Sequence, residues 1–393
     1  MLGSPGTIVV VGGGAAAQAC VAAYRDAGGD APILIVSADD RLPYFRPSVS
    51  KEYLAGEHRR DDLPLVESSW YADHDIEVLL DTRVAGLDLT TRVAATSSDP
   101  IRWDRCVLAT GSAASTLPIP GGDDPTLVTI RSAGDAERLL SRIDEDRGPV
   151  AIIGSGFVGC EVAAGLRGRG VEVTMVSAEV RPQQDRLGEA VGMLIQGWLV
   201  DAGIRVLGGR DVASIDRHGD VYAVTAADAE TVEAAHVVVA VGARPLTDLA
   251  DAAGLDADDG IDVDPTMATA ADGVFAVGDI ARAHHGVAGR RLRVEHWGDA
   301  VEHGRLAGLA LAGAPEPWRA VPGFWSTIAG QTIKYVAWGD GHDEIHVARS
   351  GSGSGTTVRY GRDGRLVGVL THDHDDDNER AGADVHAGRP MAG

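Results

Sequence analysis

The stretch TIVVVGGGAAA, residues 7–17, decides the fold of the first part of the chain. Its β-branched residues predict a buried strand, the glycines predict a tight turn, and the alanines begin a helix expected over residues 15–24. The turn has the spacing Gly12-x-Gly14-x-x-Ala17. Glycines so placed let the backbone approach a pyrophosphate at the helix N-terminus, which predicts a dinucleotide site.

An acidic residue completes this first unit. A second strand is predicted at residues 33–36, and Asp39 follows it. A carboxylate about 20 residues beyond the glycines is placed to accept hydrogen bonds from a ribose diol. The alternative reading is a tight glycine turn that binds no ligand.

The same order recurs from Val150. An apolar run over residues 150–153 leads into Gly154-x-Gly156-x-x-Gly159, and a helix is expected over residues 157–166. Two such turns in one chain, each between a strand and a helix, make a ligand-free reading of both improbable.

The acid of the second unit is harder to assign. The strand expected over residues 171–176 ends at Ser177, and the nearest carboxylate is Glu179. A carboxylate there would bind a ribose 2′-hydroxyl and repel a 2′-phosphate, whereas the nearby Arg181 would favour the phosphate. NADH is therefore the expected coenzyme, with NADPH possible.

Two βαβ units far apart predict an α/β chain with two Rossmann-like, doubly wound domains. Three further apolar runs end in glycine and predict buried strands that deliver glycine to a ligand-facing edge. Beyond Pro315 the pattern alternates, with turns between short runs, which predicts a C-terminal α+β domain with an antiparallel sheet. The three glycine-terminated runs are residues 106–109, 237–241 and 274–277.

The expected domain boundaries follow from these elements. One dinucleotide-binding domain is predicted at residues 1–115 and 242–313, and a second at residues 116–241. The C-terminal domain is predicted at residues 314–393.

The net charge of −23 argues against a nucleic-acid partner, because phosphate binding needs a basic surface. No secretory pattern and no apolar run of about 20 residues is present, so neither export nor a membrane span is expected. Three widely spaced cysteines, Cys20, Cys106 and Cys160, suit a reducing cytoplasm and are expected to be buried. The run 372–377, HDHDDD, suggests a metal site only weakly, because charge runs are usually solvated, and no metal is expected.

Several motifs resemble those of one family. Residues 43–51, PYFRPSVSK, resemble the RPPLSK stretch of oxygenase-coupled ferredoxin reductases, a group similar to rubredoxin reductase, putidaredoxin reductase and apoptosis-inducing factor. The resemblance continues in order along nearly the whole chain. The further matching stretches are residues 109–111 (ATG), 154–161, 274–279 (VFAVGD), 295–297 (EHW) and 322–326 (PGFWS).

The resemblance implies that residues 1–115 and 242–313 form the FAD-binding domain and residues 116–241 the NAD(P)H-binding domain. The Gly12 turn and Asp39 would bind the ADP part of FAD. Arg46 and Lys51 would lie along the flavin and pyrophosphate, and Asp279 would hold the ribitol chain. Lys51 and Glu161 would form an ion pair beside flavin N5, where hydride arrives. From the sequence, Asp279 is also expected to open a helix. The full set expected to contact the cofactors is Gly12, Gly14, Ala17, Asp39, Arg46, Lys51, Ala109, Thr110, Gly111, Gly154, Gly156, Phe157, Val158, Gly159, Glu161, Glu179, Gly242, Gly278, Asp279, Glu295, His296, Trp297 and Trp325.

The chain has no Cys-x-x-Cys pair and no cysteine after the first βαβ unit, where Ser48 and Ser50 stand. A thiol relay is therefore not expected. The resemblance implies hydride transfer from NAD(P)H to FAD, followed by release of single electrons to a ferredoxin or rubredoxin that feeds an oxygenase. An acidic acceptor would need a basic rim, for which Arg290, Arg291 and Arg293 are candidates.

Two other functions stay open at this point. One is a flavin oxidase or diaphorase whose acceptor is oxygen or a quinone. The other is a redox-responsive interaction protein similar to apoptosis-inducing factor. The sequence departs from the family where Ser177 replaces the usual acid and where residues 241–247 lack an asparagine after Pro245.

Overall fold

The computed structural model describes residues 2–3, 6–339, 341–349 and 355–391. Its contacts divide the chain into two compact units. The first unit comprises Met1–Phe45, Leu63–Ala113 and Pro245–Phe324, and the second comprises Arg46–Asp62, Ala114–Arg244 and Trp325–Gly393. The short strands β8 (Ser112–Ala114) and β16 (Ala243–Pro245) carry the chain across two of the boundaries.

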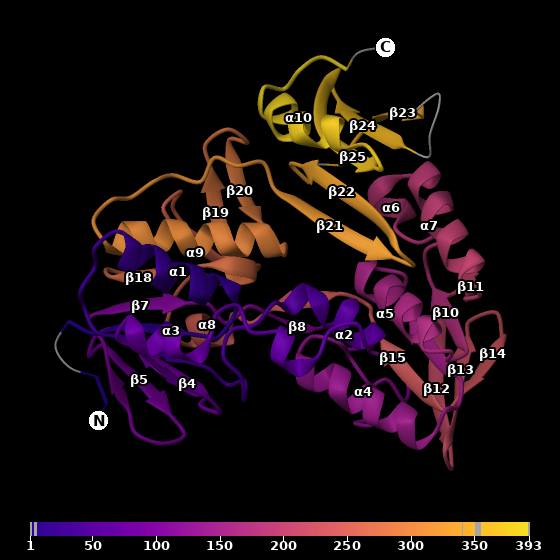
Figure 1. Cartoon of the computed structure of the whole chain (residues 1–393), viewed down its shortest axis with the longest axis horizontal. Coiled ribbons are helices and arrows are strands. Elements are labelled where there is room, and N and C mark those ends of the chain that lie inside the picture. Colours follow the sequence, from indigo (N-terminus) through magenta and orange to yellow (C-terminus); the bar gives the residue numbers. More distant parts are fainter. Residues whose placement is uncertain (1, 4–5, 340, 350–354, 392–393) are drawn as a thin grey trace. The chain divides into compact units, whose positions relative to one another are not determined.

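A five-stranded parallel sheet forms the centre of the first unit. Its order is β18-β7-β1-β2-β3, and β1 is buried along its whole length. Figure 1 shows the helices α1 and α9 on one face of this sheet and an antiparallel meander, β4-β5-β6, on the other. The bounds are β1 Ile8–Val11, β2 Ile33–Val36, β3 Ile76–Leu79, β7 Arg105–Leu108, β18 Val274–Ala276, α1 Ala15–Asp26, α9 Trp297–Leu311, β4 Val84–Asp88, β5 Val93–Thr96 and β6 Ile101–Arg102.

Smaller elements complete the first unit. A three-stranded sheet β17-β19-β20 joins one parallel and one antiparallel pair. The remaining bounds are β17 Ile261–Val263, β19 Ala281–His285, β20 Arg290–Arg293, α3 Ser68–Asp73, α8 Asp248–Ala252 and the 3-10 turn η3 Gly278–Ile280.

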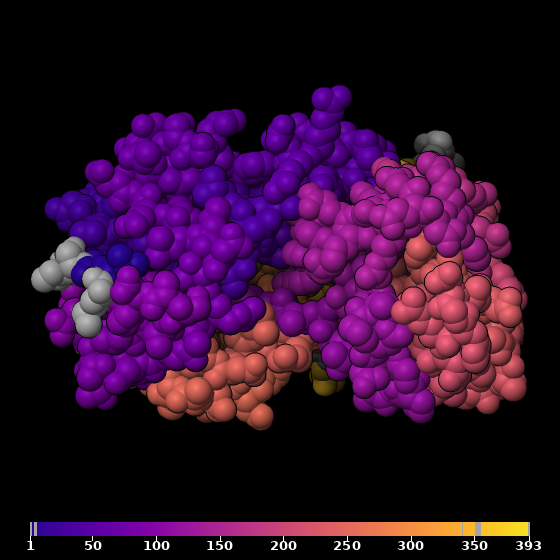
Figure 2. Space-filling model, turned by 90° about the horizontal axis from the view of Figure 1, so that it is seen from below, coloured from indigo at the N-terminus to yellow at the C-terminus, as the bar shows by residue number. Residues whose placement is uncertain are grey.

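The second unit repeats this plan with four parallel strands in the order β11-β10-β9-β15. Side chains of β9, β10 and β15 pack on the inner face of the meander β12-β13-β14 in one core cluster. The strands β12, β13 and β14 form the salmon-coloured surface at the right of Figure 2. The bounds are β9 Val150–Ile153, β10 Val173–Ser177, β11 Arg205–Gly208, β15 His236–Val239, β12 Val212–His218, β13 Val221–Ala226 and β14 Thr231–Ala234.

Helices and an antiparallel sheet complete the second unit. The C-terminal strands pair in the order β21-β22-β25-β24-β23. The strand bounds are β21 Gly323–Ile328, β22 Gln331–Ala337, β23 Glu344–Arg349, β24 Thr356–Arg362 and β25 Arg365–His372. The helix and 3-10 bounds are η1 Arg46–Ser48, α2 Glu52–Ala55, η2 Arg60–Asp62, α4 Ala133–Glu145, α5 Phe157–Gly168, α6 Gln184–Leu187, α7 Glu189–Asp201 and α10 Asp375–His386.

The predicted fold class is confirmed, with two parallel sheets and a C-terminal antiparallel sheet. The three-domain division stays a prediction, although the segment Arg46–Asp62 clusters with the second unit. One local expectation was wrong. Asp279 opens no α-helix: it lies in the 3-10 turn η3, and the strand β19 begins two residues later.

The acidic run at residues 372–377 is ordered as the end of β25 and the beginning of α10. Among the described residues, no group of three or more His, Cys, Asp and Glu side chains could hold a metal ion. No helix in the described ranges is long and apolar enough to cross a membrane.

Candidate functional site

The carboxyl ends of the parallel strands in the first unit gather most of the predicted FAD residues. Gly12 follows β1, residues 109–111 follow β7, and Gly278 and Asp279 follow β18. The order of strands reverses at β1, which has β2 on one side and β7 on the other. Because ligands of open α/β sheets bind at such a switch point, the topology places these residues where a dinucleotide is expected.

The turn after β1 presents backbone instead of side chains. Gly12 has φ of +118°, and a Cβ there would overlap the carbonyl oxygen of Ala109. Helix α1 begins after Gly14 with no side-chain cap and no acidic residue in its first turn. A Cβ at Gly14 would meet no atom within 4 Å, so space is open there. Unsatisfied N–H groups beside open space fit a pyrophosphate.

Asp39 lies beyond β2, close to the same edge. Its backbone N–H donates to Ser37 Oγ at 3.1 Å, and Tyr44 Oη donates to its carboxylate at 3.3 Å. These contacts hold the carboxylate in a defined position next to the strand end. The Tyr44 contact was not expected from the sequence.

Asp279 is buried in the turn η3, where Ser112 Oγ donates to its Oδ2 at 2.5 Å. The neighbouring Thr110 donates its hydroxyl to the carbonyl of Leu246 at 2.7 Å. Gly278 packs against helix α1, because a Cβ there would lie 3.3 Å from that of Ala16. The turn after β18 therefore joins the turn after β1 at one edge of the sheet.

The motif Glu295-His296-Trp297 lies at the beginning of α9. His296 Nδ1 lies 3.3 Å from Asp299 Oδ2, and the ring of Trp297 meets that of Phe45 edge-on at 5.1 Å. Glu295 is exposed and ion-paired with Arg293. Glu295 is thus engaged by its own chain, whereas Trp297 is fixed by an aromatic contact.

The second unit carries a matching turn after β9. Gly154 has φ of +105°, and a Cβ there would overlap the carbonyl oxygen of Ala240, at the end of β15. Helix α5 begins after Gly156, again without a side-chain cap or an acidic residue in the first turn. Among the described α-helices only α4 has a side-chain cap, so the glycine turn and not the missing cap distinguishes α1 and α5. The two helices that follow glycine turns are left uncapped where a phosphate would bind.

Glu179 lies close to this second turn. Its Oε2 accepts the backbone N–H of Gln183 at 3.1 Å and lies 3.3 Å from Ser155 Oγ, which itself contacts Ser177 Oγ at 2.6 Å. Arg181, the residue that would favour a 2′-phosphate, pairs with Glu189 at 3.4 Å. The carboxylate of Glu179 therefore occupies the place beside the glycine turn that the sequence left unassigned.

Lys51 and Glu161 form a buried ion pair in the second unit, with Lys51 Nζ 3.1 Å from Glu161 Oε1. The predicted pairing of these two residues is present. Two serines, Ser50 and Ser326, also donate to the Glu161 carboxylate. Both serines stand inside motifs quoted above, but nothing in their spacing marks them as partners of Glu161.

The other predicted residues of the second unit lie at its surface or near these groups. Arg46 donates to the carbonyl of Arg131 at 2.8 Å. Trp325 is 38% exposed and Val158 is 40% exposed. Phe157 begins α5, and Gly242, with φ of +117°, follows the end of β15. The second unit thus holds four of the residues expected near FAD, and the first unit holds the others. These four are Arg46, Lys51, Glu161 and Trp325.

The three cysteines are free and buried, as expected. Burial raises the pKa of Cys20 and of Cys106 to about 12. Burial also raises the pKa of Cys160, and the carboxylates of Glu161 and Glu179 add to this effect. The thiols therefore stay protonated and unreactive at neutral pH.

The candidate basic rim lies on β20, and its side chains are engaged. Arg291 pairs with Asp262 at 3.1 Å, and Arg293 pairs with Asp259 at 3.1 Å. Arg290 Nη1 lies 3.3 Å from the carbonyl of Arg291. Both arginines therefore contact carboxylates of their own chain, and Arg291 shares Asp262 with Arg282. The basic rim stays a prediction.

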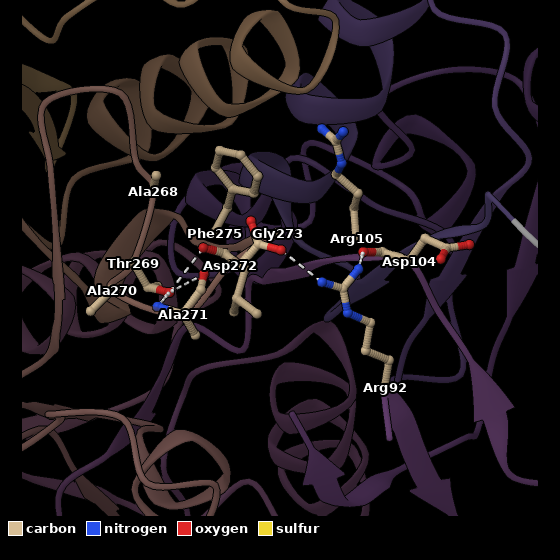
Figure 3. A pocket seen from close by; sticks show the side chains of 11 residues that line it. Arg92, Asp104, Arg105, Ala268, Thr269, Ala270, Ala271, Asp272, Gly273 and Phe275 are labelled. Carbon is tan, nitrogen blue, oxygen red and sulfur yellow. Dashed lines mark hydrogen bonds and ion pairs between the residues drawn. The ribbon is translucent and has the colours of Figure 1, made fainter. Parts of the chain in front are cut away.

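Figure 3 shows a pocket of about 550 Å³ at the opposite edge of the first sheet. Arg105 and Val274, which line it, begin β7 and β18, so the pocket lies at the amino ends of the strands. Arg92 crosses it and donates to the Asp104 carbonyl and to the Asp272 carboxylate. It is therefore separate from the glycine turns.

Known proteins resemble the chain over most of its length. The profile of the pyridine nucleotide-disulphide oxidoreductase family matches residues 6–304. The ferredoxin–NAD(+) reductase component of the biphenyl dioxygenase system of Paraburkholderia xenovorans is 34% identical over 353 residues, covering 90% of this chain and 86% of the relative. A rubredoxin–NAD(+) reductase of Pseudomonas putida is 29% identical, covering 87% of this chain and 89% of the relative.

The solved structures agree. The covalent complex of putidaredoxin reductase with putidaredoxin contains a chain that superposes with a TM-score of 0.92 at 28% identity. The match covers 99% of this chain and 94% of the other. The predicted oxidoreductase class and its cofactors, FAD and NADH, are those of this family. The chain therefore belongs to the pyridine nucleotide-disulphide oxidoreductase family, as a flavoprotein of the ferredoxin reductase type.

Proposed function

We propose that this protein takes hydride from NADH onto FAD and passes single electrons to a small iron–sulfur or rubredoxin-type protein that feeds an oxygenase. The observation that carries the proposal is that two uncapped glycine turns occur in a chain whose three cysteines are all buried. Disulfide reductases need a reactive thiol beside the flavin, and these thiols cannot serve. Electrons then have to leave the flavin directly.

Within this function we assign the first unit's turn to FAD. The N–H groups at the beginning of α1 would hold the pyrophosphate, Asp39 the ribose, and Asp279 the ribitol hydroxyls. The hydrogen bond that Ser112 donates holds the Asp279 carboxylate at the turn after β18, which supports this role. FAD supplies the conversion from a two-electron donor to a one-electron acceptor, and the chain supplies binding and orientation.

The turn after β9 would hold the pyrophosphate of NADH. Glu179 would accept hydrogen bonds from the ribose hydroxyls and would repel the 2′-phosphate of NADPH. Arg181, paired with Glu189, is not available to neutralise that phosphate without breaking the ion pair. NADH is accordingly the proposed donor.

The electron acceptor is proposed from the relatives, whose names include ferredoxin and rubredoxin reductases of dioxygenase systems. Putidaredoxin is itself bound to its reductase in one solved complex. Arg291 and Arg293 of β20 are paired with carboxylates of their own chain, so they do not support the assignment of the acceptor. We also propose the cytoplasm as the location, because the electron donor NADH and free cysteines belong to reducing compartments.

Anaerobic stopped-flow absorbance tests the proposal. The holoenzyme is mixed with NADH or NADPH, and the reduced enzyme is then mixed with a ferredoxin in the presence of cytochrome c. We expect rapid loss of flavin absorbance with NADH and strong ferredoxin-dependent reduction of cytochrome c. A flavin that stays oxidised with both coenzymes contradicts the proposal.

Two other results would redirect the assignment. Rapid consumption of NADH under air with no acceptor added would indicate an oxidase or diaphorase. Slow reoxidation, with a change of assembly on adding NADH, would indicate a redox-responsive interaction protein.

A further inference from the structure

The carboxylate of Glu161 has an unusual number of side-chain donors for a buried group. Its side chain is 4% exposed. Ser50 Oγ donates to Oε2 at 2.5 Å, Ser326 Oγ donates to Oε1 at 2.6 Å, and Lys51 Nζ lies 3.1 Å from Oε1. The carboxylate therefore has one charged and two neutral donors.

Three segments of the second unit meet at this carboxylate. Ser50 and Lys51 come from residues 46–62, Glu161 from α5, and Ser326 from β21. The serines are both nearly buried. Among the described residues neither hydroxyl has another hydrogen-bond partner, so each is committed to Glu161.

This arrangement determines which acceptors the ammonium group of Lys51 contacts. A buried carboxylate needs donors on both oxygens, and a lysine alone would be drawn toward both of them. Because Ser50 satisfies Oε2, Lys51 contacts only Oε1. A second N–H of Lys51 donates to the Pro47 carbonyl at 3.1 Å, and the third has no partner among the described residues. One donor of a nearly buried ammonium is thus left for a ligand.

We propose that Ser50 and Ser326 are positioning residues that fix Glu161, and through it keep one N–H of Lys51 available to the bound flavin. The proposal rests on the proposed function and on the position beside the flavin that the family resemblance implies for Lys51 and Glu161. The proposal adds Ser50 and Ser326 to the site and gives a reason for each. Ser50 donates to Oε2 of Glu161, and Ser326 shares Oε1 with Lys51.

Lysine is rare in this chain: only two of its 35 basic residues are lysines, Lys51 and Lys334. An arginine at position 51 would not be equivalent to the lysine. A planar guanidinium would engage both oxygens of the carboxylate and displace Ser50 or Ser326.

The test uses Ser50→Ala, Ser326→Ala and the double variant, with the exposed helix residue Ser141→Ala as the matched control. Ser326→Thr restores the hydroxyl. In anaerobic stopped-flow, we expect the limiting rate of flavin reduction by NADH to fall about tenfold for each alanine variant, since a hydrogen bond to a charged group is lost. The NADH concentration at half-maximal rate should stay unchanged, and the threonine variant should recover the rate.

A second readout does not depend on turnover. Amine acetylation of the holoenzyme, followed by mass spectrometry, compares Lys51 with Lys334, a half-buried lysine paired with Asp375, as an internal reference. We expect the ratio of Lys51 to Lys334 modification to rise in both alanine variants and to return toward that of the unmodified sequence in Ser326→Thr. If an alanine variant loses its flavin, Ser50→Cys and Ser326→Cys replace it, because a thiol keeps the size and donates only weakly.

Alanine variants with an unchanged rate and an unchanged acetylation ratio would overturn the inference. So would a slowed rate that the threonine variant fails to restore, because packing alone would then explain the effect. The failure of the proposed function is a separate result. In that case NADH does not reduce the flavin of the protein without substitutions. The acetylation ratios still report whether the serines position Lys51.

Discussion

The two glycine turns, residues 12–17 in the first unit and residues 154–159 in the second, begin alike and end differently. Gly12 and Gly154 both have positive φ, and a Cβ on either would overlap the carbonyl at the end of the neighbouring strand. The third position is Ala17 in one turn and Gly159 in the other. A Cβ at Gly159 would lie 2.5 Å from the carbonyl oxygen of Gly154, whereas Ala17 carries its Cβ in a buried, packed position.

The first glycine of each turn is therefore required by the neighbouring strand of the sheet. The residue at the third position depends on how the following helix packs against the turn. The first glycine must pass the adjacent strand end, so both units need it. The third position decides how closely the helix approaches its own turn. The acids differ as well, because Asp39 is held by a tyrosine and Glu179 by backbone N–H groups.

The largest expected effect comes from Gly12→Ala and Gly154→Ala. Positive φ costs a non-glycine residue of order 1–3 kcal/mol, and the overlap with a strand-end carbonyl adds to it. We expect Gly12→Ala to lose FAD, seen as a low ratio of absorbance at 450 nm to that at 280 nm. Gly154→Ala should keep FAD and lose reduction by NADH.

The matched control is Gly168→Ala at the end of α5, where a Cβ meets no atom within 4 Å. It should leave both cofactors unaffected. Retention of FAD by Gly12→Ala would remove the assignment of the first turn to this cofactor.

The next effect concerns the coenzyme. Glu179→Gln removes the charge that repels a 2′-phosphate, and a hydrogen bond to a charged group is worth about 1.5–3 kcal/mol. We expect the preference for NADH over NADPH, measured as the ratio of kcat/KM values, to fall about tenfold or more.

Glu172→Gln, at the opposite end of β10, is the control for loss of one negative charge and should leave the ratio unchanged. An equal response of the two variants would show that overall charge, and not the Glu179 carboxylate, sets the preference.

A smaller effect is expected when the third positions are exchanged. Gly159→Ala forces the Gly154 carbonyl to move and should raise KM for NADH severalfold. Ala17→Gly causes no overlap and should cost only about 1 kcal/mol of stability through helix propensity. Thermal unfolding and NADH titration measure the two. If Ala17→Gly raised KM for NADH more than Gly159→Ala does, the assignment of NADH to the second turn would be contradicted.

The smallest effect is expected from thiol reagents on the helices after the turns. Cys20 lies on α1 and Cys160 on α5, and burial raises the pKa of both thiols. Because a raised thiol pKa means the protonated form persists as pH increases, we expect no reaction with a disulfide reagent between pH 6 and about 9. Flavin reduction by NADH should be unaffected.

In denaturant, the same reagent should titrate all three cysteines. Fast modification of the native protein at neutral pH would show that a thiol is exposed and would reopen the thiol-relay mechanism.

Local pattern alone was enough to predict the two parallel sheets and the turns after β1 and β9. A glycine spacing between an apolar strand and an alanine-rich helix is a local signal, so it is legible without the fold. The missed turn at Asp279 has a physical reason as well. A glycine and an acid after a strand look like a helix beginning, but the next residues, Ala281–His285, pair with β17 and β20 instead.

Residue types and their spacing were enough to predict two dinucleotide sites and the lack of a reactive cysteine pair. The acid beside the second turn and the hydroxyls that reach Glu161 could be identified only from the folded arrangement of the chain. Ser50 and Ser326 lie 111 and 165 residues from Glu161, and Ser112 lies 167 residues from Asp279. Contacts over such separations depend on how strands and helices pack, and no local pattern encodes them.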